Sequence, residues 1–246
     1  TETDGRHAKV EHINDWQLDS ERRDFTINAI YLDINGNIFD PQMGTIDLKN
    51  NVVKFIGDPQ KRIEEDYLRI IRFIRFKIMY DNKVETTTNN AIKQNLNGIK
   101  KISKERILSE LLKILGTKSF VKINNNKQLK EIFTLIFAEF KYLERLNKLV
   151  NISNKSNFDK KTLLAIMLID EKNNHEYFSH KYNVSKELKE SLNLIAKNFT
   201  HFKKNKDFFL KNLKKNIYFF GKKHLIKLNI LYFASTKKAK LRDYLN

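Results

Sequence analysis

The chain has 246 residues, 41% apolar and 31% charged, a balance typical of a globular protein, and no apolar stretch reaches the roughly 20 residues that a membrane-spanning helix needs. It has no cysteine, which excludes disulfides and thiolate metal sites and fits a reducing cytoplasm. The net charge is +18, and the excess of basic residues is confined to the sequence after residue 57. Residues 1–57 carry 6 basic and 10 acidic side chains, whereas residues 58–246 carry 41 basic and 19 acidic side chains. Such a field attracts nucleic acid or an anionic membrane, although a lysine-rich composition that only keeps a helical protein soluble is the simpler alternative.

The first part of the chain predicts short strands joined by tight turns. Thr1–Glu11 favours a turn followed by a short strand, and residues 15–24 favour a short acidic helix or loop. A strand is expected over Phe25–Asp33, and Ile38-Phe39 is expected to return beside it, because the Asn35-Gly36 dipeptide between two apolar runs is a strong hairpin signal.

A turn is expected next, at the pattern Asp40-Pro41-x-x-Gly44-x-x-Asp47. Proline cannot continue a strand ladder and glycine admits positive φ, so we interpret the two aspartates as acceptors that tie the loop. Val52–Ile56 then favours a short strand, and Asp58-Pro59 has the composition of a helix N-terminus.

Residues 60–80 are predicted to form one helix with two distinct faces. On it, Asp66 and Arg69 are three residues apart and therefore neighbours. Phe73 and Phe76 could line a pocket on the same side, although core packing is the more common use of such residues. The opposite face is apolar and consists of Ile63, Tyr67, Ile70, Ile71, Ile74 and Ile78.

The pair Asp66 and Arg69 offers hydrogen-bond acceptors beside several donors. The Watson–Crick edges of cytosine and adenine carry an amino donor next to an acceptor, which this arrangement matches. Guanine and uracil present a carbonyl where that amino group would be. One Asp/Arg pair could therefore accept C and A and reject G and U without a nucleic-acid template, although a surface ion pair worth about 0–1 kcal/mol is the simpler interpretation of an isolated D-x-x-R.

The rest of the chain is predicted to be helical. A helix is expected over residues 84–99, and Ser103 has the composition of the next N-cap, with Glu105 in the first turn. The buried face of that helix is expected to comprise Ile107, Leu108, Leu111, Leu112 and Leu115. Later helices are expected within 129–150, 161–170, 185–199, 207–220 and 222–234, with Phe199, Phe202, Phe208, Phe209, Tyr218 and Phe219 as core aromatics.

Four blocks in this order resemble the class II tRNA nucleotidyltransferases, that is, the CCA-adding enzymes and the bacterial poly(A) polymerases. They are Arg22-Arg23-Asp24-Phe25-Thr26-Ile27-Asn28-Ala29, the Asp40–Asp47 turn, Glu65-Asp66-x-x-Arg69-x-x-Arg72-x-x-Arg75-Phe76, and Ile102-Ser103-x-Glu105-Arg106-Ile107-x-x-Glu110-Leu111. The resemblance implies a mainly α fold in which a partial α/β nucleotidyltransferase head precedes all-α parts. The expected division is a head over 1–57, a neck over 58–115, and a tRNA-binding body and tail over 116–246.

The resemblance also implies roles for individual residues. Asp66 and Arg69 would meet the base edge, Arg23 and Asp24 would contact the incoming nucleotide, and the remaining nucleotide-binding residues, Arg72 and Arg75, would lie near the triphosphate. Residues that would support this site from behind are Arg22, Glu65, Glu105 and Arg106.

The family's catalytic Asp-x-Asp does not occur in this chain, since no two aspartates are separated by one residue. The histidines form no metal-ligand pattern either, so no catalytic or metal residue is predicted within the chain. Nucleotidyl transfer needs Mg²⁺ held by carboxylates. We therefore expect the Mg²⁺ ligands in a preceding segment, the chain to be a piece of a longer or split protein, and the chain alone to be inactive.

Three functions remain open. The first is CCA addition to the 3′ end of tRNA from CTP and ATP, and the second is a poly(A) polymerase of the same class that takes ATP alone. The third is a non-catalytic RNA-binding fragment, which would bind RNA with strong salt dependence and no nucleotide preference. In each case the expected partner is tRNA or another RNA 3′ end, not a membrane, and the expected location is the cytoplasm.

Overall fold

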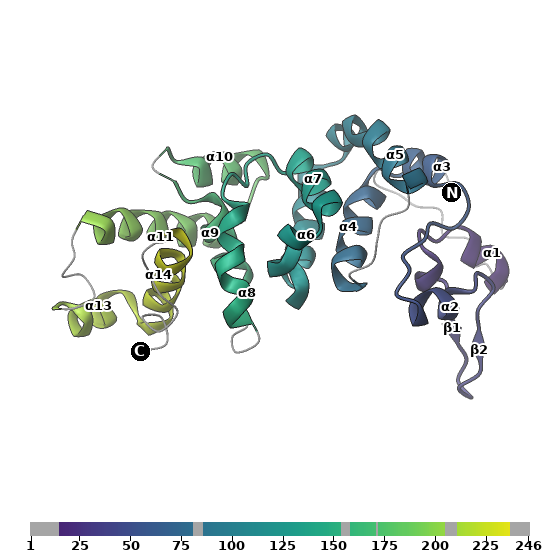
Figure 1. The fold of residues 1–246 in the computed structure, drawn as a ribbon, viewed down its shortest axis with the longest axis horizontal. Helices are drawn as coiled ribbons and strands as arrows, with labels where there is room; N and C mark the ends of the chain where they lie inside the picture. The colour runs from purple at the N-terminus through teal and green to yellow at the C-terminus, as the bar shows by residue number, and fades with distance from the viewer. Residues whose placement is uncertain (1–14, 81–85, 154–157, 171, 205–210, 237–246) are drawn as a thin grey trace.

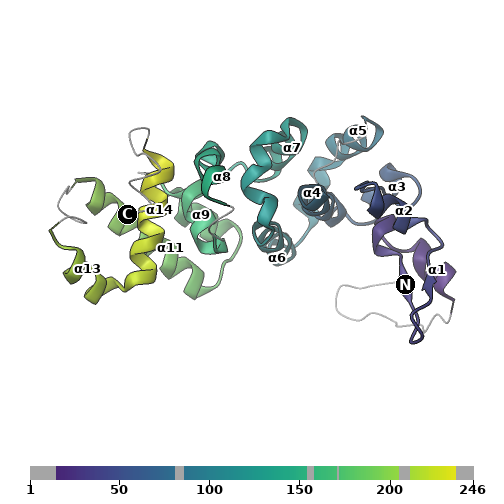
Figure 2. The same ribbon diagram turned by 60° about the horizontal axis from the view of Figure 1, so that its bottom comes forward.

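The computed structural model describes residues 15–80, 86–153, 158–170, 172–204 and 211–236. The molecule is elongated, and most of its parts follow one another along the long axis in sequence order, whereas the last helix turns back to lie beside Lys160–Leu168 (Figures 1 and 2). The described residues are mainly helical with a single two-stranded sheet, which confirms the predicted fold class. The turn and strand expected in Thr1–Glu11 lie outside the described residues.

The predicted hairpin is present after the short helix α1, Trp16–Glu21. Strands β1, Tyr31–Leu32, and β2, Ile38–Phe39, pair antiparallel, and Gly36 in the turn has φ of +85°. The strand expected over Phe25–Asp33 is too long, because Thr26–Asn28 forms a 3₁₀ turn, η1.

The predicted turn at residues 40–47 contains a helix, α2, Gly44–Lys49. Asp40 begins it by accepting hydrogen bonds from Gly44 N at 2.7 Å and from Thr45 N at 2.8 Å, and Asp47 accepts one from the Thr26 hydroxyl at 2.6 Å. The loop-tying role of both aspartates is thus confirmed. Gly44 lies so close to residue 26 that a Cβ there would meet the Thr26 carbonyl oxygen at 2.2 Å. The strand expected at Val52–Ile56 is reduced to one bridge, between Phe25 and Phe55.

The single helix expected over residues 60–80 is wrong, because two helices occupy this stretch. Helix α3, Pro59–Glu65, begins at the predicted Asp58-Pro59 cap, and α4 covers Leu68–Tyr80. Between them Asp66 has extended backbone, with φ of −153° and ψ of 104°, and its side chain accepts a hydrogen bond from Leu68 N at 3.0 Å. Asp66 and Arg69 are therefore not neighbours on one continuous helix.

Of the next three elements, α6 packs against α4, and α5 packs against α3. Ser103 caps α6 as predicted, and Glu105 lies in its first turn. The buried face of α6 is Ile107, Glu110, Leu111, Ile114 and Leu115, whereas the expected Leu108 and Leu112 are only partly buried. The elements are α5, Thr86–Asn95, η2, Leu96–Lys101, and α6, Lys104–Leu115.

The body region is all-α where it is described. Tyr218 and Phe219 were expected in the core and are 85% and 64% exposed, because their short helix packs on α14 at the end of the molecule. Phe199 is buried and Phe202 partly buried, as expected, and Phe208 and Phe209 lie outside the described residues. The continuous helix expected over 129–150 is divided among α7, η4 and α8. The elements are η3 Lys118–Asn125, α7 Lys127–Ile136, η4 Leu143–Leu146, α8 Asn147–Ser153, α9 Lys160–Leu168, α10 Asn174–Lys181, α11 Lys186–Lys204, α13 Leu213–Phe220 and α14 Lys222–Ser235.

The described part of the head region docks on α4 through aromatic rings. Phe25 and Phe55 have ring centroids 4.8 Å apart, and Phe73 of α4 stacks on Phe55 at 5.7 Å. These side chains belong to one apolar core that continues through the helices to Ala234. No helix within the described ranges is both long and apolar enough to cross a bilayer.

Candidate nucleotide site at the head–neck junction

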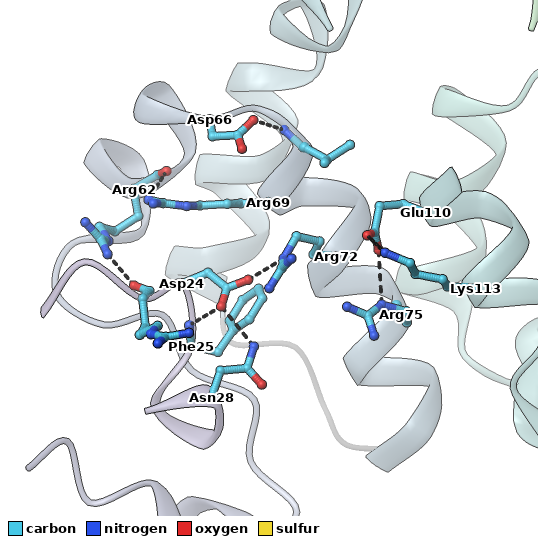
Figure 3. Close-up of polar contacts among 12 residues, drawn as sticks. Asp24, Phe25, Asn28, Arg62, Asp66, Arg69, Arg72, Arg75, Glu110 and Lys113 are labelled. Atoms are coloured by element: carbon cyan, nitrogen blue, oxygen red, sulfur yellow. Dashed lines mark hydrogen bonds and ion pairs between the residues drawn. The ribbon is translucent and has the colours of Figure 1, made fainter. Parts of the chain in front are cut away.

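Asp24 joins the head region to α4 through a buried carboxylate. Its Oδ1 accepts hydrogen bonds from Phe25 N at 3.0 Å and from Asn28 Nδ2 at 2.9 Å. Its Oδ2 accepts one from Arg72 Nε of α4 at 2.5 Å (Figure 3). The first two bonds bend the chain into η1, which explains why the predicted long strand does not form here. The third fixes one edge of the Arg72 guanidinium and leaves its two terminal amino groups for other acceptors.

Arg22 and Arg23 both pair with Asp19 of α1. Arg23 Nη2 lies 2.7 Å from Asp19 Oδ2, and the Tyr31 hydroxyl donates to the same oxygen at 2.7 Å. The arginines and the tyrosine lower the pKa of Asp19 to about 2, with the Arg23 hydrogen bond as the largest cause. Arg23 is thus held at the edge of the junction by an ionised carboxylate.

Asp66 pairs with an arginine from α6. Its Oδ2 accepts a hydrogen bond from Arg106 Nη2 at 2.8 Å (Figure 3). Arg106, which was expected to support the predicted site from behind, thus contacts Asp66 directly. Glu105 does not contact the Asp66 segment in the described part of the structure. Its described side-chain hydrogen bond to another element comes from Asn183, which lies in the loop after α10 and donates to it at 3.4 Å. The reason is that Glu105 and Arg106 are consecutive and so point about 100° apart around the helix.

Arg69 contacts α3. Its Nη1 donates to Glu65 Oε2 at 2.6 Å and to the Arg62 carbonyl oxygen at 2.8 Å. Arg62 in turn donates from Nη2 to the carbonyl oxygens of Glu21 and Arg23, which joins α3 to the end of α1. The sequence did not reveal Arg62, because an arginine in the first turns of an amphipathic helix resembles an ordinary surface charge.

Arg69, Arg72 and Arg75 turn progressively around α4. Residues three apart on an α-helix differ by about 60° in direction, so the three guanidiniums cannot share one face. Arg75 accordingly faces α6, where its Nε lies 3.1 Å from Glu110 Oε2 (Figure 3). Lys113 Nζ lies 2.7 Å from the other oxygen of the same buried carboxylate. The structure therefore separates Arg75 from Arg69 and Arg72, and Glu110 is a second residue whose role the sequence did not reveal.

The junction offers acceptors and donors but no described metal site. The Asp66 side chain is 33% exposed, and its two described bonds leave lone pairs available; the Arg69 side chain is 15% exposed, and both its described bonds use Nη1. No cluster of three or more histidines, aspartates or glutamates within the described ranges could hold a metal ion. The described residues thus do not fit a Mg²⁺ site.

Two family models match the chain. The "Poly A polymerase head domain" matches residues 1–54, and the "Probable RNA and SrmB- binding site of polymerase A" matches residues 83–124. They fall on either side of the α3–α4 segment that contains Asp66 and Arg69. The family matches and the site thus adjoin each other.

Named relatives match nearly half of the chain. CCA tRNA nucleotidyltransferase 1, mitochondrial, of Homo sapiens is 50% identical over 116 residues, which are 46% of this chain and 27% of the human protein. The CCA-adding enzyme of Ligilactobacillus salivarius is 44% identical over 110 residues, which are 45% of this chain and 27% of that enzyme. The chain thus spans about a quarter of the length of these relatives.

Solved structures match over almost the whole fold. The CCA-adding enzyme of Bacillus stearothermophilus in complex with CTP has a TM-score of 0.67 at 21% identity, over 95% of this chain and 58% of that one. The Thermotoga maritima CCA-adding enzyme complexed with tRNA has a TM-score of 0.65 at 20% identity, over 94% and 59%. The fold is thereby shared with CCA-adding enzymes of known structure. Over the matched regions the chain is similar to CCA-adding enzymes and poly(A) polymerases, in agreement with the resemblance seen in the sequence.

Proposed function

We propose that the chain selects the nucleotide and holds the RNA in a template-independent nucleotidyl transfer, the addition of CCA to the 3′ end of tRNA from CTP and ATP. The observation that carries this proposal is the Asp24–Arg72 ion pair, which joins the head region to the α3–α4 segment that also contains Asp66 and Arg69 (Figure 3). The names and identities of the relatives support the same reaction. The Mg²⁺ of the reaction would be held by residues other than those described.

The base would be selected by groups that Asp66 and Arg69 still have available. A cytosine or adenine amino group would donate to an Asp66 lone pair, while a ring nitrogen would accept from the Arg69 N–H groups beyond Nη1. A guanine or uracil carbonyl would face the carboxylate and be repelled. Arg72, with its two terminal amino groups, is suited to bind phosphate oxygens bidentately.

The decisive experiment measures the binding of CTP, ATP, GTP and UTP to the chain and to Asp66→Ala. We expect the unmodified chain to prefer CTP and ATP, and the variant to lose about 1–3 kcal/mol of that preference, as for a lost bidentate base contact. Glu64→Ala is the matched control, because Glu64 is an exposed acid on α3 that pairs only with Gln60 among the described residues. Equal binding of all four nucleotides by the unmodified chain, or an unchanged preference in Asp66→Ala, would contradict the assignment.

A poly(A) polymerase of the same family is the second candidate, supported by the name of the head-domain model. It would use the same residues for ATP alone. Incorporation of CTP against ATP onto a tRNA that lacks CCA distinguishes the two, when the chain is supplied with a head segment that carries the family's Asp-x-Asp. The proposed location is the cytoplasm, and mitochondrial import of the tagged protein would contradict it, since the human relative is named as mitochondrial.

A further inference from the structure

The Arg62 side chain of α3 binds three acceptors at the head–neck junction. Its Nη2 donates to the carbonyl oxygen of Glu21, at the end of α1, at 2.9 Å and to the carbonyl oxygen of Arg23. Its Nη1 donates to Glu65 Oε2 at 2.8 Å. The side chain is only 13% exposed. Because the N–H groups of a guanidinium form a rigid planar fork, these bonds hold Arg62 in one orientation.

The loop after α1 is thereby bound from both sides of the break at Asp66. Arg62 lies in α3, before the break, and binds the Arg23 carbonyl oxygen. Arg72 lies in α4, after the break, and donates to Asp24 Oδ2 at 2.5 Å (Figure 3). Since the backbone at the break is extended, α3 and α4 do not form one continuous rigid helix. The two bonds to one short loop therefore help to fix the position of α3 relative to α4.

Arg62 also contacts one of the two predicted base-selecting side chains. Arg69 Nη1 donates to the Arg62 carbonyl oxygen at 2.8 Å and to Glu65 Oε2 at 2.6 Å (Figure 3). The same glutamate oxygen accepts from the Arg62 guanidinium. Arg62 thus holds the loop through its side chain and Arg69 through its carbonyl oxygen and the shared carboxylate. A shift of α3 would move both acceptors of Arg69 Nη1.

We infer that Arg62 is a positioning residue for base selection, which holds α3 at the angle to α4 that sets Asp66 relative to Arg69. This inference rests on the proposed function, in which those two side chains select the base. Groups that recognise a ligand must be held within about 0.5 Å of the productive geometry by the contacts around them. Arg62 supplies such contacts without itself touching the nucleotide.

The test measures binding of CTP, ATP, GTP and UTP to the full chain and to Arg62→Lys. Lysine keeps the charge but lacks the fork of donors, so we expect the preference for CTP over UTP to fall roughly tenfold, as for a lost hydrogen bond to a charged group. This ratio of affinities does not report stability, because an unfolded fraction weakens the apparent binding of all four nucleotides equally. Arg62→Ala should reduce the ratio at least as much, and the lysine variant keeps the test valid where the alanine variant does not fold.

Lys61→Ala is the matched control, because Lys61 is the exposed residue before Arg62 on α3. Its ratio of CTP to UTP affinity should equal that of the unmodified chain. Inorganic triphosphate, which has no base, should bind Arg62→Lys and the unmodified chain equally well. In the Asp66→Ala background, Arg62→Lys should cause no further loss of preference, since it acts through a pair that is already removed.

The outcomes separate this inference from the proposed function. A preference for CTP that is present in the unmodified chain and retained in Arg62→Lys would overturn the role of Arg62 and leave the proposed function intact. Equal binding of all four nucleotides by the unmodified chain would overturn both. An equal loss with and without Asp66→Ala, an equal effect of Lys61→Ala, or a matching loss of triphosphate binding would each show that Arg62 does not act through the base-selecting pair.

Discussion

At the scale of single residues, the head–neck junction consists of ion pairs, some between elements and others within one helical turn. Asp24 holds Arg72, Asp66 holds Arg106, and Asp19 holds both Arg22 and Arg23. Each predicted nucleotide-binding arginine is thus given a fixed direction by a carboxylate. Such preorientation reduces the conformational entropy that the side chain loses when a ligand binds.

The pKa of Asp19 makes a prediction about stability and pH. Its value in the folded chain, about 2, is below the ordinary 3.8, so the stabilisation it provides is present above pH 3.8 and is lost as the pH falls toward 2. We expect Asp19→Asn to unfold more readily at pH 7 and this deficit to shrink as the pH falls below 4. Denaturant titrations between pH 3 and 7 measure the difference in free energy of unfolding.

The control for this prediction is Glu21→Gln, which removes a carboxylate of the same helix that has no ion pair among the described residues. Its difference from the unmodified chain should vary less with pH over the same range. A deficit of Asp19→Asn that stays constant down to pH 3 would contradict the assigned pairing.

The sequence singled out candidate polar residues but did not reveal which partners they contact. Asp66, Arg69 and Arg106 were identified because their spacing matched a known order of blocks. Arg62 and Glu110 were missed, since their partners lie 39 and 35 residues away in sequence, on Arg23 and Arg75. Spacing within one helix says nothing about contacts of that range, because they are set by how the elements pack.

At the scale of elements, the break between α3 and α4 is the feature that positions Asp66. Tyr67 follows it, and its ring lies against η2 at Gly98, where a Cβ would come within 2.1 Å of the ring carbons. Glycine is required at this close approach. The Lys101 ammonium lies 5.5 Å from the centre of the same ring. The residue that follows the break therefore packs against η2.

Gly98→Ala should disturb this arrangement. The added methyl group must displace the Tyr67 ring, so we expect a loss of about 1–3 kcal/mol in the free energy of unfolding, as for overpacking of a filled site. Asn97→Ala, at the exposed neighbouring position of η2, should change it by less than about 0.5 kcal/mol. Denaturant titration of both variants measures this, and similar stabilities of the two would show that Tyr67 moves aside without cost.

Elements with local signals were predictable, and elements set by tertiary contacts were not. Asn35-Gly36, Asp58-Pro59 and Ser103 each marked a turn or a helix start that the structure contains. The break at Asp66 has no glycine or proline, and the apolar periodicity continues across it. Only the side-chain bond from Leu68 N to Asp66 and the packing of Tyr67 on Gly98 reveal why the helix stops.

At the scale of the whole molecule, charge and shape act together. The sequence after residue 57 carries the net positive charge, and its described helices extend along the axis away from the acidic head region (Figure 2). Under the proposed function, an RNA drawn to that field would lie along the helices while its end reaches the head–neck junction. Such an arrangement would require the described head region to stay docked on α4.

The docking contact predicts how the chain unfolds. Phe73 is fully buried and stacks on Phe55, whereas Phe133 is buried in a separate aromatic group with Phe120, Phe137 and Phe140 in the body region. Each truncation to alanine should lower the free energy of unfolding by about 3–5 kcal/mol. Because the molecule is elongated, we expect Phe73→Ala to reduce hydrogen-exchange protection mainly in residues 15–57 and α4.

The matched variant Phe133→Ala should give the opposite pattern, with protection lost around η3 and α7 and kept in the β1–β2 hairpin. Hydrogen exchange read by mass spectrometry on both full-length variants makes this comparison directly. The physical reason is that cavities in two distant parts of one continuous core weaken the contacts that each part makes locally. If both variants instead lose protection evenly from α1 to α14, the chain unfolds as one cooperative unit.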